Sequence, residues 1–145
     1  MRVSRARVTL KRLSKQASEK DITLCLENTE EDTETLSEIF RRLPELRFCL
    51  DVGHANLFSN DPEMFIEVFS DRIEHIHIHS NHGGDSEDDD IHLPVGEGNI
   101  DYHSIIAKIR GIGYNDTITL ELHPRFNTKE KAEYLTLLRS YFSIP

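Results

Sequence analysis

Four strand-like stretches decide the fold of this chain: ITLCLEN (22–28), FCLDVGH (48–54), EHIHIHS (74–80) and TITLELHP (117–124). A turn and a helical pattern follow each of them, which is typical of consecutive βα units with a parallel sheet. Near its C-terminal end each stretch also carries one residue of a metal-binding type: Glu27, Asp51, His77 and Glu121. Because parallel strands present their C-terminal ends at one edge, we expect these four side chains to converge on one point.

Two glutamates, an aspartate and a histidine form a mostly oxygen donor set, which suits Mn²⁺, Mg²⁺, Co²⁺ or Zn²⁺. A single acidic residue at a strand end is usually a helix cap or a solvated residue. Four candidates at matching positions instead favour a shared site for one divalent metal ion.

The segments between the strands have the apolar spacing and the end signals of helices. The first places Leu10, Leu13 and Ala17 on one face, and another starts with Asp61-Pro62 as N-cap and first helical residue. The expected helices span 4–19, 33–43, 62–70, 102–109 and 128–142, and the expected strands span 22–27, 47–52, 73–79 and 117–122. No linker separates these elements, so the sequence predicts one α/β domain over residues 1–145.

The two faces of the expected strands differ in polarity. Side chains alternate along a strand, and one face is apolar almost throughout: Leu24, Leu26, Phe48, Leu50, Ile76, Ile78, Leu120 and Leu122. The other face is polar at the same depth in each strand, with Cys25, Cys49, His75 and Thr119 in one layer and the four candidate ligands in the next. An open doubly wound sheet gives no reason for this pattern, whereas the inside of a barrel that ends in an active site does.

Further polar residues near the strand ends leave two interpretations open. His79 is either a loop residue or a substrate contact. The acidic run at 85–90 is most simply a solvated loop. Its last member, Asp90, forms a ligand–x–ligand pair with His92.

Composition excludes several classes of protein. With 37% hydrophobic residues and no apolar run of 18, the chain is expected to be soluble, and residues 1–20 lack the apolar stretch of a signal peptide. A net charge of −9 argues against broad contact with nucleic acid or with an anionic membrane. The two cysteines, both inside expected strands, fit a reducing cytoplasm.

Five segments together resemble the xylose isomerase-like TIM-barrel superfamily: LEN (26–28), DVGHAN (51–56), HIHSN (77–81), DIHLPVGEGNID (90–101) and LEL (120–122). The superfamily includes sugar isomerases and epimerases and the endonuclease IV type of AP endonuclease. The resemblance implies an eight-stranded (β/α)8 barrel in which these motifs belong to the last four strands. The chain is therefore expected to be a partial TIM barrel of about four βα units, the C-terminal half only.

For the epimerase-like branch, the resemblance implies one divalent metal on Glu27, Asp51, His77 and Glu121. Glu27 and Glu121 would also be the catalytic acid/base pair, moving a proton of a sugar, sugar phosphate or keto-acid through an enediolate. His54 matches a substrate-binding histidine. The expected activity is that of a sugar isomerase or epimerase, an enzyme once the barrel is complete. An arginine that some epimerases carry would fall near Gly83 and is absent, which leaves the substrate open.

For the nuclease branch, the resemblance implies zinc-dependent cleavage of abasic DNA. There His54, Asp90 and His92 match ligands of an additional zinc ion, so they form a possible second metal site. The acidic balance and the lack of a basic rim loop favour the sugar interpretation. A third alternative is a metal-binding remnant that is inactive alone.

Half a barrel has two open sheet edges, which must be covered. Either a missing N-terminal half-barrel covers them, or two copies form a homodimer, or the chain is poorly stable alone.

Overall fold

The computed structural model describes residues 2–58 and 60–143, with side chains from residue 8 onward. They form one parallel sheet in the order β1-β2-β3-β4. The strands are β1 (Cys25–Glu27), β2 (Arg47–Asp51), β3 (Ile73–Ile78) and β4 (Ile118–Leu120). The predicted α/β class with consecutive parallel strands is confirmed.

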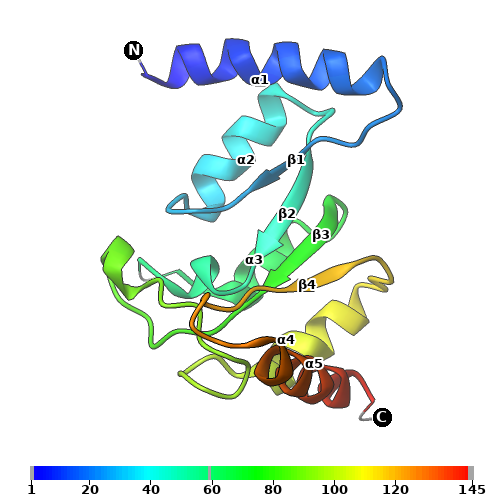
Figure 1. Ribbon diagram of the computed structural model, residues 1–145. Coiled ribbons are helices and arrows are strands. Elements are labelled where there is room, and N and C mark those ends of the chain that lie inside the picture. Colours follow the sequence, from blue (N-terminus) through cyan, green and yellow to red (C-terminus); the bar gives the residue numbers. More distant parts are fainter. Residues whose placement is uncertain (1, 59, 144–145) are drawn as a thin grey trace.

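Every expected helix is present, with ends shifted by up to two residues: α1 (Arg2–Ser18), α2 (Thr33–Arg42), α3 (Pro62–Val68), α4 (Tyr102–Gly111) and α5 (Thr128–Phe142). Two short 3₁₀ turns, η1 (His54–Asn56) and η2 (Glu87–Asp89), were not expected. Figure 1 shows the strands following one another across the molecule, with α1 and α5 at opposite ends. Among the described helices, none has both the length and the apolarity needed to cross a membrane.

Side-chain caps explain where the helices begin. Asp32 accepts a hydrogen bond from the Thr35 amide, and Asp101 accepts bonds from the amides of His103 and Ser104. Such caps satisfy backbone donors that have no partner inside the helix. They fix where α2 and α4 begin, and with that the ends of the loops that carry the candidate site.

The core lies between the apolar face of the sheet and the helices. Phe48 and Leu50 of β2 are fully buried against Phe40 of α2 and Phe65 of α3. The Phe40 and Phe48 rings meet edge to face with centroids 5.7 Å apart. Burying each such side chain contributes about 1.5–3 kcal/mol, so this layer holds the strands in place from outside.

The inner face of α1 differs from the expectation. Leu10 and Ala17 are half-buried as expected, but Leu13 is 40% exposed and Ser14 is buried. At 100° per residue, positions 10, 14 and 17 form a narrow stripe from which position 13 deviates. The amphipathic pattern located the helix correctly but misplaced the centre of its buried face.

Neighbouring strands are staggered, so the four candidate ligands do not lie in one layer across the sheet as expected. Cys49 pairs with His75 and Asp51 with His77, as expected. Glu27, however, pairs with Cys49 rather than with Asp51, and His77 pairs with Thr119 rather than with Glu121. Both shifts of two residues run in the same direction, which is the stagger that tilted strands of a barrel require.

Candidate metal centre

The structure places the four predicted ligands at the C-terminal edge of the sheet, where donor atoms of Asp51, His77 and Glu121 lie within 4.8 Å of one another and Glu27 contacts His77. Oε1 of Glu27 and Oε1 of Glu121 each lie 3.2 Å from Nδ1 of His77. Oδ2 of Asp51 lies 3.8 Å from the same nitrogen. The glutamate side chains are 35% and 32% exposed, whereas Asp51 is fully buried. The site therefore has a buried floor and two carboxylates open to solvent.

Asp51 is held rigidly. Asn28, which follows Glu27, donates to the carbonyl of Asp51 at 2.9 Å and accepts from its amide at 2.8 Å. Oδ1 of Asp51 accepts from the His54 amide at 2.7 Å, while Oδ2 is buried and has no hydrogen-bond partner among the described residues. Burial raises the pKa of Asp51, but the imidazoles of His79 and His54 outweigh it, so the pKa lies below its usual value. The carboxylate is thus ionised, with a free oxygen that faces the other candidate ligands.

His54 lies on η1, between the two candidate sites. Its Nδ1 lies 3.0 Å from the carbonyl oxygen of Asn28, and its Nε2 lies 3.2 Å from Oδ2 of Asp90. Burial lowers the pKa of His54, but the Asp51 and Asp90 carboxylates outweigh it and raise the pKa above its usual value. The residue is 17% exposed, which leaves it accessible to a small molecule.

The possible second metal site also comes together. Nε2 of His54 and Nε2 of His92 each lie 3.2 Å from Oδ2 of Asp90. Ser80 and Leu93 form an antiparallel bridge with both N···O distances 2.7 Å, and this bridge brings the 90–92 segment back over the strand ends. An open cavity of about 300 Å³ lies against His54 and Asp90.

His79 corrects one expectation. Its side chain is 0% exposed, so in this structure it is neither a solvent-exposed loop residue nor accessible to a substrate, the two roles that the sequence left open. The ring packs between Gly53 and His92. Residue 79 lies on the same inner face as His75 and His77, because side chains alternate along a strand. This position in the sequence could have indicated that His79 is buried.

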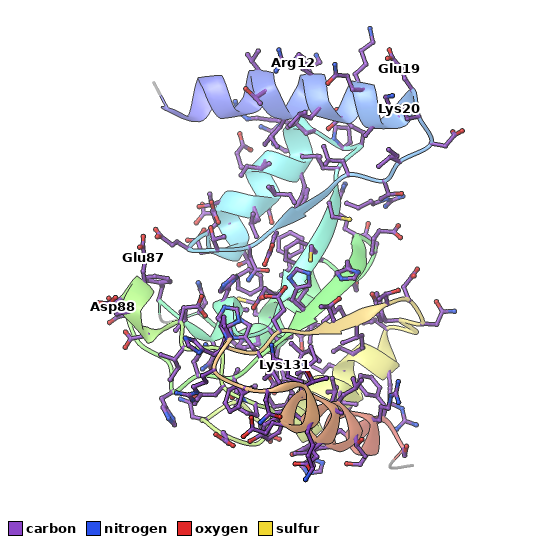
Figure 2. The ribbon with its side chains drawn as sticks, viewed as in Figure 1. Arg12, Glu19, Lys20, Glu87, Asp88 and Lys131 are labelled. Atoms are coloured by element: carbon purple, nitrogen blue, oxygen red, sulfur yellow. The ribbon has the colours of Figure 1, made fainter. Side chains whose placement is uncertain are left out.

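Two buried asparagines, Asn28 and Asn81, fix the backbone around the candidate site. Asn28 fastens Asp51, and Asn81 donates to the carbonyl of Gly53 at 2.8 Å. Each directly follows a strand or its extension, where an amide can bond to a neighbouring strand end. The acidic run behaves as expected, since Glu87 and Asp88 project outward from η2 (Figure 2).

A larger open cavity, of about 850 Å³, follows the free edge of β4. Its lining includes Glu121 and His92 from the candidate sites and Lys131 and Leu135 from α5. Figure 2 shows Lys131 on α5 beside β4. The candidate metal centre is therefore open toward this edge of the sheet.

The chain matches the family described as "Xylose isomerase-like TIM barrel" over residues 3–138. It is 34% identical to the uncharacterized protein MJ1311 of Methanocaldococcus jannaschii over 116 residues, 77% of this chain and 37% of that protein. It is 33% identical to MJ1188 of the same organism over 124 residues, 80% of this chain and 43% of that protein. The chain thus spans less than half the length of these relatives.

Solved structures agree with the fold. A D-tagatose 3-epimerase-like protein superimposes with a TM-score of 0.82 at 30% identity, over 94% of this chain and 53% of that one. The IolI protein, solved with a binding zinc atom, has a TM-score of 0.73 at 19% identity, over 94% of this chain and 53% of that one. With the family matched over most of its residues, the chain belongs to the xylose isomerase-like TIM barrel family, and its parallel sheet corresponds to a partial barrel.

Proposed function

We propose that this chain carries the metal-binding and proton-transfer residues of a divalent-metal-dependent sugar isomerase or epimerase. The observation that supports it best is the position of Glu27 and Glu121, whose Oε1 atoms both lie 3.2 Å from Nδ1 of His77. Two carboxylates that both approach one point can provide the proton acceptor and the proton donor that acid/base transfer at a carbon needs. The epimerase-like protein described above is consistent with this class of reaction.

The donor set fits a divalent ion. Glu27, Asp51, His77 and Glu121 offer three carboxylates and one imidazole, a set suited to Mn²⁺, Mg²⁺, Co²⁺ or Zn²⁺. Oδ2 of Asp51 is buried without a hydrogen-bond partner among the described residues, which is costly unless a cation or water satisfies it. These four residues would hold the ion.

An ion held by Glu27, Asp51, His77 and Glu121 would supply the positive charge that makes a C–H next to a substrate carbonyl more acidic. Glu27 or Glu121 removes that proton, leaving the substrate as an enediolate. The opposite glutamate returns a proton to the other face or to the adjacent carbon. Both carboxylates are partly exposed, so a small sugar-like substrate can reach them. His54, at the edge of the site, orients a substrate hydroxyl.

Isotope exchange tests the proposal. The assembled protein, loaded with Mn²⁺, Co²⁺ or Zn²⁺, is expected to exchange a substrate α-proton with solvent deuterium for a member of a panel of ketoses, keto-acids and inososes, followed by NMR. Glu27→Gln and Glu121→Gln should each abolish exchange, because each removes a proton-transfer group. Glu45→Gln changes an exposed glutamate away from the site and should leave exchange intact.

A second candidate function, phosphodiester cleavage of abasic DNA, has one observation in its favour. His54, Asp90 and His92 lie together beside the first site and could bind an additional zinc ion. Cleavage of an abasic oligonucleotide by the same preparation, without exchange on the sugar panel, would favour the nuclease.

A further inference from the structure

Buried asparagines hold the turn after β2 from two sides. This turn runs from Asp51 to His54 and leads into η1. On the β1 side, Asn28 bonds to both the amide and the carbonyl of Asp51. On the β3 side, Nδ2 of Asn81 donates to the carbonyl of Gly53 at 2.8 Å. Asn28 thus fixes the metal-binding end of the turn, and Asn81 fixes the end that carries His54.

The side chain of Asn81 is 0% exposed, and its amide group has only one suitable orientation. Its Oδ1 accepts from Nδ2 of Asn56 at 2.8 Å and from the Gly83 amide at 2.9 Å. The Gly83 amide can only donate and the Gly53 carbonyl can only accept, so the oxygen and nitrogen of this side chain cannot exchange places. Two of its three bonds lead to the turn and η1, and the third leads to the loop after β3.

Asn56, the last residue of η1, extends this set of bonds. Its Nδ2 carries two hydrogens, and it donates to Oδ1 of Asn81 and to Oδ1 of Asn99, each at 2.8 Å. Asn99 in turn donates to the carbonyl of His82 at 3.0 Å. The three asparagines therefore join η1 to both ends of the 82–99 loop.

Anchoring that loop is the competing explanation for Asn81. The loop is already attached through its backbone, because Ser80 and Leu93 exchange two hydrogen bonds with N···O distances of 2.7 Å. The Asn99 amide also donates to the backbone carbonyl of Asn81 at 3.0 Å, and this bond does not need the side chain. What the side chain adds to these contacts is chiefly its two bonds to the turn and η1.

His54 lies between the two residues that these bonds hold, Gly53 and Asn56. Its Nδ1 lies 3.0 Å from the carbonyl oxygen of Asn28, which can only accept a hydrogen bond, so Nδ1 carries a proton. Its Nε2 faces Oδ2 of Asp90 at 3.2 Å. A shift of η1 would break the bond to Asn28 and turn the ring, and a misplacement of about 1 Å can cost about 100-fold in rate.

We propose that Asn81 is a positioning residue that acts through His54. Its side chain holds η1 in place, and η1 in turn holds the imidazole at the edge of the metal centre. The contact of His54 with a substrate hydroxyl rests on the proposed function, whereas the hydrogen bonds that hold η1 do not depend on it. A residue that follows β3 thus sets the orientation of a ring that follows β2.

NMR of the imidazole groups in isotope-labelled protein tests the proposal without a substrate. The Nδ1 proton of His54 should exchange slowly with water in wild type, because it is bonded to Asn28 and the side chain is 17% exposed. Asn81→Asp keeps the size of the side chain but places a carboxylate oxygen against the Gly53 carbonyl. Loss of this buried hydrogen bond should speed the exchange by about 10-fold or more. Asn115→Asp makes the same change at an exposed asparagine and should have no effect.

Asn56→Ala keeps the test decisive if Asn81→Asp does not fold. It removes both bonds of Nδ2 at a half-buried position and should change the Nδ1 proton of His54 in the same way. Within the described residues, neither asparagine side chain is hydrogen-bonded to a predicted metal ligand. Co²⁺ binding at the metal centre should therefore stay within about 3-fold of wild type. An unchanged His54 signal in a folded variant would overturn the proposal.

Isotope exchange on a reactive sugar of the panel adds a functional measurement. Asn81→Asp should raise KM by about 10-fold or more. The same substitution in His54→Ala protein should raise it by no more than about 2-fold further, because its effect passes through His54. Equal effects in both backgrounds would show that Asn81 acts by another route and would overturn the proposal. If no sugar exchanges, the proposed function fails, while the NMR result still decides whether Asn81 positions His54.

Discussion

Oε1 of Glu121 lies 3.2 Å from Nδ1 of His77, although the partner of His77 in the sheet is Thr119. The Glu121 amide donates to the carbonyl of Ile78 at 2.9 Å, so the ladder continues beyond β4 and carries Glu121 above His77. Positions 119 and 121 face the same side because side chains alternate along a strand. The candidate metal centre thus depends on the stagger between neighbouring strands.

We predict that the chain binds one divalent ion through Glu27, Asp51, His77 and Glu121. His77→Ala and Glu121→Ala should each weaken binding at this site by more than about 100-fold, because each removes a direct donor. Titration followed by metal analysis measures it. His75→Ala is the control, since His75 lies deeper and its Nε2 contacts Oγ1 of Thr119 at 2.9 Å. Equal metal content in all variants would contradict the assignment.

Gly53→Ala should destabilise the protein. The new Cβ overlaps the His79 ring, which is fully buried and stacks on His92, and overpacking of this kind costs about 1–3 kcal/mol. Gly111→Ala, at the end of α4, places its Cβ where no atom lies within 4 Å and should be neutral or slightly stabilising. Chemical denaturation of both variants measures the difference. Equal free energies of unfolding would show that the packing around His79 is looser than described.

Stability should fall in acid partly through Glu63. Ser104 donates to its Oε1 at 2.5 Å and Lys108 lies 3.2 Å from its Oε2, and these contacts hold the pKa of Glu63 below its usual value. Because the pKa of Glu63 is lower in the folded state, its ionised form stabilises the protein. This stabilisation is complete above the unfolded-state pKa and is lost as the pH falls through the folded-state pKa. Because Glu63 and Lys108 are both partly exposed to solvent, we expect this contribution to be less than about 1 kcal/mol.

Denaturation of wild type and Glu63→Gln between pH 7 and pH 3 measures this contribution. The variant should be less stable at pH 7 and converge on wild type in acid. Glu34→Gln, which changes an exposed glutamate in the first turn of α2, is the control. If the difference in free energy of unfolding between wild type and Glu63→Gln increases in acid, the pKa of Glu63 is not lowered by folding.

The chain is expected to associate through its sheet edges. In the described residues β1 and β4 each pair with one strand, and an open cavity of about 850 Å³ follows β4. Unpaired edges recruit further strands. A homodimer, or a complex with a polypeptide that supplies the other half of a barrel, would cover them.

Light scattering combined with thermal unfolding at several concentrations measures the association. The unfolding midpoint should rise with concentration if two copies associate. A monomer that unfolds cooperatively at a concentration-independent temperature would show that the described half needs no partner.

The fold class and the candidate ligands could be predicted from local patterns. Glu27, Asp51, His77 and Glu121 each end an apolar alternating stretch, and the helix expected at 62–70 begins with Asp61 as N-cap and a first-turn proline. The Asp61-Pro62 signal can be read directly from the sequence, because it acts within a few residues of chain. The same holds for the polar inner face, which indicated a barrel rather than an open sheet.

Only the tertiary structure decided how the strands are staggered and where His79 lies. Glu27 pairs with Cys49 and His77 with Thr119, because strand tilt depends on how the whole sheet packs rather than on the residues of one strand. His79 is buried because Gly53 and His92, 26 and 13 positions away, enclose its ring. Alternation determines which side of a strand a residue faces, but the depth it reaches and the donors it meets are set by contacts between distant segments.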